Sequence, residues 1–169
     1  MKRLYLLLVC VVLQSCFYTN DDDDIQIVDP FFGNYEPVIM NRTDFEASTS
    51  YDPNERIIEN SGKIYVKDNY IFINEVNQGF HIIDNSNPSQ PNNIGFITVL
   101  GSTDLSIKED VYYVNNATDL IAFKINTNSQ GISISKRLEN VFPQIWSPEG
   151  AVHYGLEENQ IIVDWKLIE

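Results

Sequence analysis

A pattern of short apolar runs repeats along this chain with a period of about 40 residues. The segment from Lys67 to Asn74 lines up with the segment from Lys108 to Asn115, and residues 80–84 line up with 120–124. Within each unit, β-branched and aromatic runs alternate with turns rich in Asn, Asp, Gly and Pro, which is typical of antiparallel strands. A unit of this length with about four strands has the size of one β-propeller blade. The sequence therefore predicts an all-β fold with two antiparallel four-stranded repeats, over about 62–101 and 102–140.

One segment of the first unit carries a recognisable signature. From Gly79 to Pro91, a Gly is followed by an apolar strand, an Asp and two prolines separated by a short polar loop. This signature resembles the LVIVD repeat, and the resemblance extends over 62–101. It is weaker over 102–140, where Lys124 replaces the Asp and Asn128 replaces the first Pro. Residues 141–165 resemble the tail that follows such repeats in bacterial lipoproteins. The resemblance implies a β-propeller-like architecture in an exported bacterial protein, and it assigns no catalytic residues.

Two units are too few for the ring that this family resemblance suggests, because closed propellers have four to eight blades. Three arrangements remain open: a compact, open or sandwich-like β domain, association with other copies, or a truncated product. We expect the compact domain. Outside the repeats, Thr43 and Glu46 fit a capping box, which predicts one short helix over 43–48 near the N-terminus. Further strands are expected over about 150–166.

The N-terminus has the layout of a secretory signal. A basic start precedes the apolar run 4–13, which is shorter than the about 20 residues that a membrane-spanning helix needs. The four residues Leu13 to Cys16 resemble a bacterial lipobox. This resemblance implies that residues 1–15 form a lipoprotein signal peptide and that Cys16 is lipidated and becomes the new N-terminus. Cys10 lies within the apolar run and is not expected to be the lipidated residue.

Residues 16–36 are polar and acidic and are expected to form a tether, followed by a β-repeat domain over 37–169. The acids from Asp21 to Asp24 are expected to keep the tether solvated, since four consecutive acids do not preorganise a calcium site. They also resemble a surface-export signal of some Gram-negative lipoproteins. The expected location is therefore the outer membrane of a bacterial envelope, and outward display stays open.

The charge of the chain excludes several partners. The formal net charge is −13, and removing Lys2 and Arg3 with the signal would leave 9 basic and 24 acidic residues, a charge near −15. Nucleic acids and anionic lipid surfaces both require a basic face, so neither is an expected partner. The lipid anchor is then the only expected contact with the membrane. Two Cys and two His nearly exclude a zinc cluster, and no cofactor motif occurs.

Few residues stand out as chemical groups. His81 and His153 lie in strand-like runs, where a half-buried structural histidine is the expected role. No hydrolase, metalloprotease or nucleotide-binding motif occurs, so no catalytic, metal or cofactor residue is predicted. Trp146 lies on a loop between Pro143 and Pro148 and is the expected ligand or partner contact. It could equally cover an open sheet edge.

These features predict a lipid-anchored envelope lipoprotein that acts as a binding or scaffold module for a protein or a glycan. Two alternatives remain. The first is a glycan-active enzyme that uses paired carboxylates in a cleft. The second is a structural subunit that pairs its sheet edge with another chain.

Overall fold

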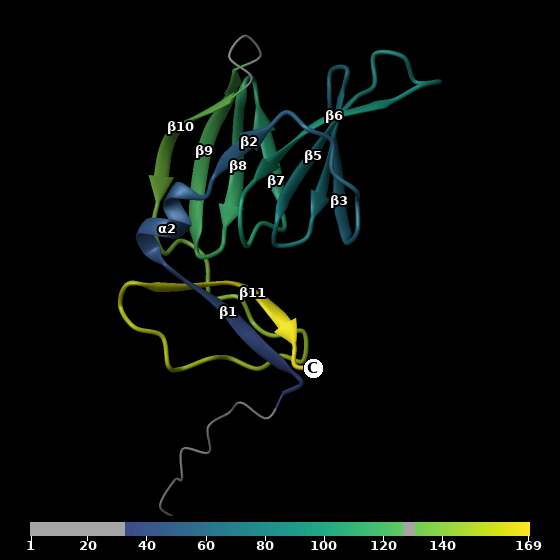
Figure 1. The fold of residues 1–169 in the computed structure, drawn as a ribbon. Helices are drawn as coiled ribbons and strands as arrows, with labels where there is room; N and C mark the ends of the chain where they lie inside the picture. Colours follow the sequence, from purple (N-terminus) through teal and green to yellow (C-terminus); the bar gives the residue numbers. More distant parts are fainter. Residues whose placement is uncertain (1–32, 127–130) are drawn as a thin grey trace, which may run out of the picture.

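The computed structural model describes residues 33–126 and 131–169 (Figure 1). The predicted signal peptide, Cys16 and the run from Asp21 to Asp24 lie outside the described residues. Within the described ranges, strands dominate and one short helix occurs, which confirms the all-β prediction. No described helix has the length and apolar character needed to cross a membrane.

The first predicted repeat forms four antiparallel strands that are neighbours in the sheet in chain order. A short fifth strand is added beside the last of them, so the sheet order is β2-β6-β5-β4-β3. We call this sheet the first blade. Its strands are β2 (Ser50–Asp52), β3 (Ser61–Lys67), β4 (Tyr70–Glu75), β5 (Gly79–Asp84) and β6 (Asn92–Thr98).

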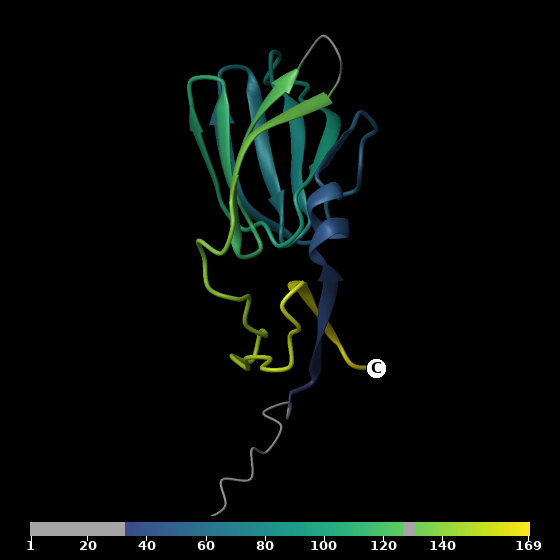
Figure 2. The same cartoon turned by 90° about the vertical axis from the view of Figure 1, so that its left-hand side faces the viewer.

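The second repeat forms a four-stranded antiparallel sheet with the order β10-β9-β8-β7, which we call the second blade. Its strands are β7 (Leu105–Lys108), β8 (Val111–Asn116), β9 (Asp119–Asn126) and β10 (Gly131–Leu138). The two blades pack face to face (Figure 2). The prediction of two blade-like units in an open, sandwich-like arrangement is therefore confirmed.

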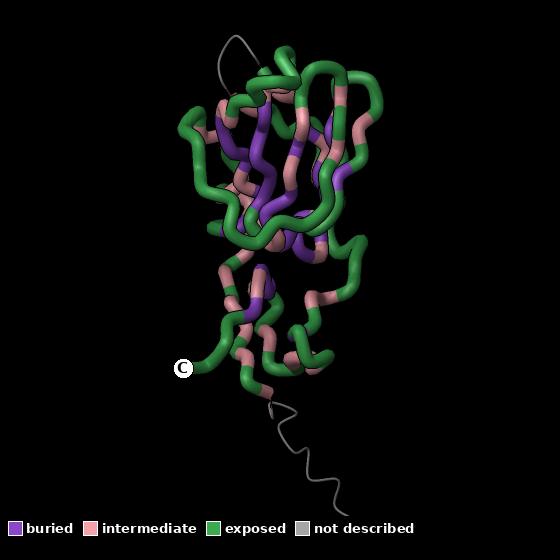
Figure 3. Tube along the Cα trace, turned by 90° about the vertical axis from the view of Figure 1, so that its right-hand side faces the viewer, coloured by how far each residue is buried: buried purple, intermediate pink, exposed green. Residues whose placement is uncertain are grey.

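The main core lies between the two blades, where alternate side chains of each strand point inward. Aromatic rings hold its centre: Phe72 meets Tyr112 edge-on at 5.3 Å between ring centroids, and Tyr112 stacks on Phe123 at 5.5 Å. Figure 3 shows the buried residues gathered in these strands. The buried core residues are Phe72, Phe80, Ile82, Ile97, Val99, Leu105, Tyr112, Val114, Ile121 and Phe123.

A third, two-stranded sheet joins the two ends of the described chain. It pairs β1 (Tyr35–Asn41) with β11 (Gln160–Leu167) in antiparallel fashion, below the blades in Figures 1 and 2. The strand β1 begins at Tyr35, two residues before the end of the predicted tether 16–36. Pairing with β11 orders this segment. The strands expected over 150–166 begin only at Gln160, because most of residues 151–159 form no regular structure.

The helix α2 (Arg42–Ala47) follows β1 directly. It begins one residue before the predicted range 43–48. The predicted capping box of Thr43 and Glu46 is wrong, because Asn41 is the N-cap and makes no side-chain capping bond. Instead, the Arg42 N–H donates to the carbonyl of Asn159 at 2.8 Å, and Glu46 accepts from the Arg42 guanidinium at 3.2 Å. A tertiary contact with the C-terminal segment thus sets where the helix begins.

Candidate functional site

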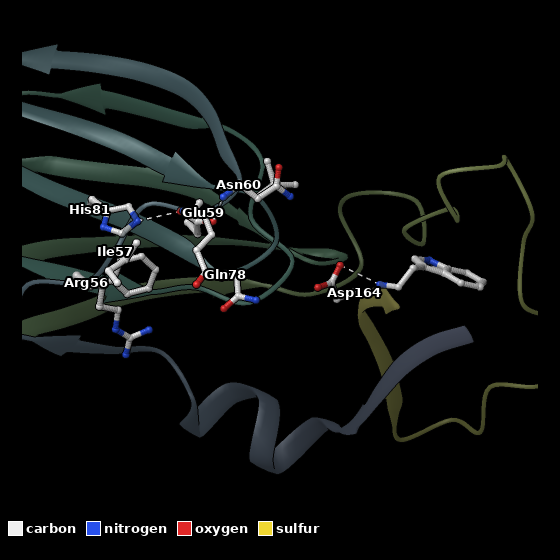
Figure 4. Close-up of a pocket in the computed structure, with 11 residues that line it drawn as sticks. Arg56, Ile57, Glu59, Asn60, Gln78, His81 and Asp164 are labelled. Carbon is white, nitrogen blue, oxygen red and sulfur yellow. Dashed lines mark hydrogen bonds and ion pairs between the residues drawn. The ribbon is translucent and has the colours of Figure 1, made fainter. Parts of the chain in front are cut away.

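A hollow of about 510 Å³ lies where the first blade meets β11. One wall is the segment 53–60, which we call the crossing segment. It leaves β2 at one edge of the first blade and passes over the outer face of the sheet to reach β3 at the other edge. In Figure 4, His81 lies at the end of the hollow inside the first blade, and Asp164 of β11 lies at the other end of the hollow. Asn77, in the turn after β4, donates to the Asp164 carboxylate at 2.7 Å and so ties the blade to β11.

Glu75 is the buried acid of this hollow. Its carboxylate accepts the backbone N–H of Glu59 at 3.2 Å, the backbone N–H of Asn60, and a contact from His81 Nε2 at 3.0 Å. Burial by itself would raise the pKa of Glu75, but the hydrogen bonds from Asn60, His81 and Glu59 outweigh burial and lower it. Glu75 therefore stays ionised and fastens the crossing segment to the end of β4.

His81 is fully buried beside Glu75, so the expectation of a half-buried histidine is wrong. Its ring meets Phe96 edge-on at 4.8 Å, and its Nδ1 is buried without a hydrogen-bond partner in the part of the chain that the structure describes. The Arg56 guanidinium lies over the Phe96 ring, 4.3 Å from the ring centroid. The crossing segment thus covers the histidine, which a period-two strand pattern alone does not reveal.

Sequence reasoning missed Glu75 because an acid at the end of a strand looks like an ordinary turn residue. Both of its oxygens are occupied by hydrogen bonds, and its pKa is lowered. A general acid for glycoside cleavage needs a raised pKa and an accessible proton. Glu75 therefore has a structural role, which is to hold the segment 53–60 against the end of β4. This hollow gives no support to the alternative of an enzyme with paired carboxylates. No group of described His, Cys, Asp and Glu residues is arranged to hold a metal ion.

A second surface feature lies on the segment 141–155, which contains the predicted contact residue Trp146 and which we call the aromatic loop. Trp146 is 60% exposed and Tyr154 is 77% exposed. Trp146 is thus accessible to a partner, and its role as a contact residue stays a prediction. His153, on the same loop, forms no part of the hollow lining.

The aromatic loop is held by several hydrogen bonds rather than by secondary structure. The Gln144 side chain donates to the carbonyl of His153 at 3.0 Å, and the Ser147 N–H donates to the carbonyl of Ala151 at 2.9 Å. The buried Trp165 of β11 donates its ring N–H to the carbonyl of Ile145 at 3.0 Å. Because Trp165 also lines the hollow, it joins the two features.

The first blade corresponds to a known family of repeats. Residues 60–99 match the model of the LVIVD repeat. The chain contains an LVIVD repeat. The matched segment comprises the crossing residue Asn60, strands β3 to β6, and the Glu75 and His81 pair, so the LVIVD repeat is a complete four-stranded blade here. The second blade has the same four-stranded meander without falling in the matched range. Searches of curated proteins and of solved structures find no match.

Proposed function

We propose that this chain is a lipid-anchored lipoprotein of the bacterial outer membrane, in which the LVIVD-repeat blades support a binding surface. The proposal combines the lipobox-like residues ending at Cys16 with the β-propeller-like module. Residues 1–15 would be removed, residues 16–36 would act as the acidic tether, and the domain after it would face away from the membrane.

The observation that carries the binding role is the exposure of two large aromatic side chains on a braced loop. Trp146 and Tyr154 leave most of their surface in water, so a partner that covers these side chains would gain hydrophobic free energy. The hydrogen bonds from Gln144, Ser147 and Trp165 hold the loop before binding, so little conformational entropy is lost on contact. Such preorganised aromatic anchors are typical of binding hot spots.

A glycan is the ligand that this surface fits best. Aromatic side chains offer flat apolar faces with polar edges, which match the apolar faces and hydroxyl rims of sugar rings. The exposed carboxylates of Glu157 and Glu158 follow Tyr154 closely in the chain and can accept hydrogen bonds from sugar hydroxyl groups. The module would then hold an envelope glycan without changing it.

Tryptophan fluorescence of the full chain tests this role, with chitotetraose as the first probe. Trp146 is exposed and Trp165 is buried, so a bound sugar should change mainly the Trp146 emission. We expect a saturable blue shift that Trp146→Phe removes and Tyr154→Ala weakens by about tenfold. Tyr113→Ala, which changes an exposed tyrosine of the second blade, should leave binding unchanged. A saturable response that persists in Trp146→Phe and Tyr154→Ala would contradict the proposed surface.

The anchor has a separate test. Cells that express the full chain should carry it in the membrane fraction, and Cys16→Ala should move it to the soluble fraction without changing its circular dichroism spectrum. Membrane partitioning that survives this substitution would contradict the lipid anchor.

A further inference from the structure

We propose that the hollow between the first blade and β11 binds a short peptide with free termini, with the peptide carboxylate at Arg56 and its ammonium group at Asp164. This inference does not depend on glycan binding or on the lipid anchor, because it concerns a different set of residues. It rests on the opposite charges at the two ends of the hollow and on the polar groups between them.

The end of the hollow inside the first blade carries a positive charge. The Arg56 guanidinium lies 4.3 Å from the centroid of the Phe96 ring, and its side chain is 43% exposed. Among the described residues its ion-pair partner is Asp52 at 3.5 Å, and a partly exposed pair of this kind contributes little. Since a guanidinium has five N–H donors, Arg56 keeps donors for a carboxylate that enters the hollow.

A second polar group at this end lacks a partner. His81 is fully buried, and its Nε2 contacts the Glu75 carboxylate at 3.0 Å. Its Nδ1 is also buried, and no group in the described part of the chain bonds it. A buried ring nitrogen without a partner costs free energy, and a polar ligand group that bonds Nδ1 removes this cost. The end of the hollow near Arg56 and His81 is therefore suited to a polar group of a ligand.

The other end of the hollow carries a carboxylate with a free oxygen. Asp164 Oδ1 accepts from the Asn77 side chain at 2.7 Å and from the Trp165 N–H at 2.8 Å. Its Oδ2 accepts none of the hydrogen bonds among residues 33–126 and 131–169. An ammonium group at this place would form a charge-assisted hydrogen bond with Oδ2. Asp164 is therefore suited to the amino terminus of a peptide.

The other two acids that line the hollow do not cancel this arrangement. The Glu75 carboxylate is already compensated by the backbone N–H groups of Glu59 and Asn60 and by the contact with His81. The Glu59 side chain is exposed, so water and salt screen its charge. The two charged groups that remain available are the Arg56 guanidinium and the Asp164 carboxylate.

The middle of the hollow matches a peptide chain. In Figure 4, the side chains of Asn60 and Gln78 lie between His81 and Asp164. Each side-chain amide offers both donors and an acceptor, which are the partners that a peptide group needs. Ile57 adds apolar surface, and the volume of about 510 Å³ is within the range of small-molecule sites, about 300–1,000 Å³. A neutral glycan lacks the two terminal charges, so a peptide with free termini fits this hollow better.

Isothermal titration calorimetry of the full chain tests the site with the peptides Ala-Leu, Ala-Leu-Ala and Ala-Leu-Leu-Ala. Because the two charged groups of the hollow are fixed in place, we expect saturable binding with an optimum at one length. On the best peptide, N-acetylation and C-terminal amidation should each weaken binding by about tenfold, since each removes one terminal charge. No saturable binding of any of the three peptides, or equal binding of the blocked forms, would overturn the proposal.

Two variants assign the two ends of the peptide. In Arg56→Gln the free acid and the amide should bind equally, whereas acetylation should still weaken binding. In Asp164→Asn the pattern should be reversed. Lys124→Gln and Asp44→Asn make the same changes at exposed positions outside the hollow and should keep both effects. A variant that is merely less stable would not lose one effect selectively, and circular dichroism verifies the fold of each protein. If both effects persist in both variants, the peptide does not bind between these charges and the proposal is wrong.

A competition experiment separates this site from the proposed glycan surface. Trp146 does not line the hollow, so Trp146→Phe should bind the best peptide with unchanged affinity. Chitotetraose should not displace the peptide from the wild type. Loss of peptide binding in Trp146→Phe, or displacement by chitotetraose, would place the peptide on the aromatic loop and contradict a peptide site in the hollow. Failure of chitotetraose to bind at all would contradict only the glycan surface.

Discussion

At the scale of single residues, Glu75 illustrates how a buried charge can hold a loop to a sheet. Replacing Glu75 with Gln removes the charge and leaves the N–H groups of Glu59 and Asn60 with a weaker acceptor. We expect the free energy of unfolding at pH 7 to fall by about 1–3 kcal/mol, measured by urea denaturation.

The pH dependence of this effect has a definite sign. Because the folded-state pKa of Glu75 is lowered from 4.5, its contribution is present above pH 4.5 and is lost as the pH falls through the folded-state pKa. The stability difference between wild type and Glu75→Gln should therefore shrink on acidification. Glu59→Gln makes the same change on an exposed neighbour and should have little effect at any pH. A difference that stays constant down to pH 2 would show that the charge of Glu75 is not the cause.

At this scale, the accessibility of Trp146 was predictable from the sequence, whereas the burial of His81 and the role of Glu75 were not. The exposure of Trp146 follows from a loop bounded by two prolines, which is local information. The burial of His81 and the role of Glu75 depend on the segment 53–60, which crosses the sheet and supplies the donors. The sequence of the strand around His81 does not indicate that the segment 53–60 covers this side chain.

At the scale of elements, Gly79 fixes how β5 starts beside β6. Its φ is +148°, and a Cβ at this position would lie 1.9 Å from the carbonyl oxygen of Ile97. Since that oxygen belongs to the backbone of β6, Gly79→Ala must separate the two strands. We expect a loss of about 3 kcal/mol or more in the free energy of unfolding, measured by urea denaturation.

Gly150 provides the matched control for this substitution. Its φ is +82°, but a Cβ there would meet nothing within 4 Å. Gly150→Ala should therefore cost only the backbone strain, about 1–2 kcal/mol. Equal losses for the two variants would show that φ, and not the approach of β6, determines the need for glycine at Gly79.

The strands of the two repeats were predictable because turns rich in Asn, Asp, Gly and Pro separate runs with period-two character. The elements outside the repeats were less predictable. The strand β2 and the ends of β1 and β11 depend on partners distant in sequence, and Arg42 starts α2 through a bond to Asn159 rather than through a capping residue. The period-two pattern is sufficient to predict strands that pair with their neighbours in the chain. It is not sufficient to predict strands that pair with distant segments.

At the scale of the whole molecule, two apolar clusters and a small number of polar joints hold the two blades, the helix and the terminal sheet together as one body. Tyr65 of the first blade donates to Asp104 at the start of the second, and the Leu105 N–H donates back to the Tyr65 hydroxyl at 3.1 Å. Burial and the neighbouring Asp104 raise the pKa of Tyr65 to about 12, so this joint keeps its proton at neutral pH. The number of blades was predictable from the repeat, whereas the closure by β1 and β11 was not.

Asp119 is the joint between the second blade and the helix, and its replacement is the most direct test of this assembly. The fully buried carboxylate accepts from the Arg137 guanidinium at 2.8 Å, from the Arg42 guanidinium at 3.0 Å and from the Asn140 N–H at 3.1 Å. Burial would raise the pKa of Asp119, but these hydrogen bonds, with Arg42 first among them, outweigh burial and lower it. The charge is therefore kept, and it compensates two arginines at once.

Asp119→Asn leaves both arginines without their shared anion, and one of them is largely buried. We expect a loss of about 3–5 kcal/mol in the free energy of unfolding, because removing one partner of a buried ion pair leaves an uncompensated charge. Asp44→Asn, on the exposed side of α2, should change stability by no more than about 0.5 kcal/mol. Hydrogen exchange should show faster opening of α2 in Asp119→Asn than in Asp44→Asn, since Arg42 connects the helix to this carboxylate. Loss of stability with unchanged exchange in α2 would place the damage in the second blade alone and contradict the role of Asp119 as a joint.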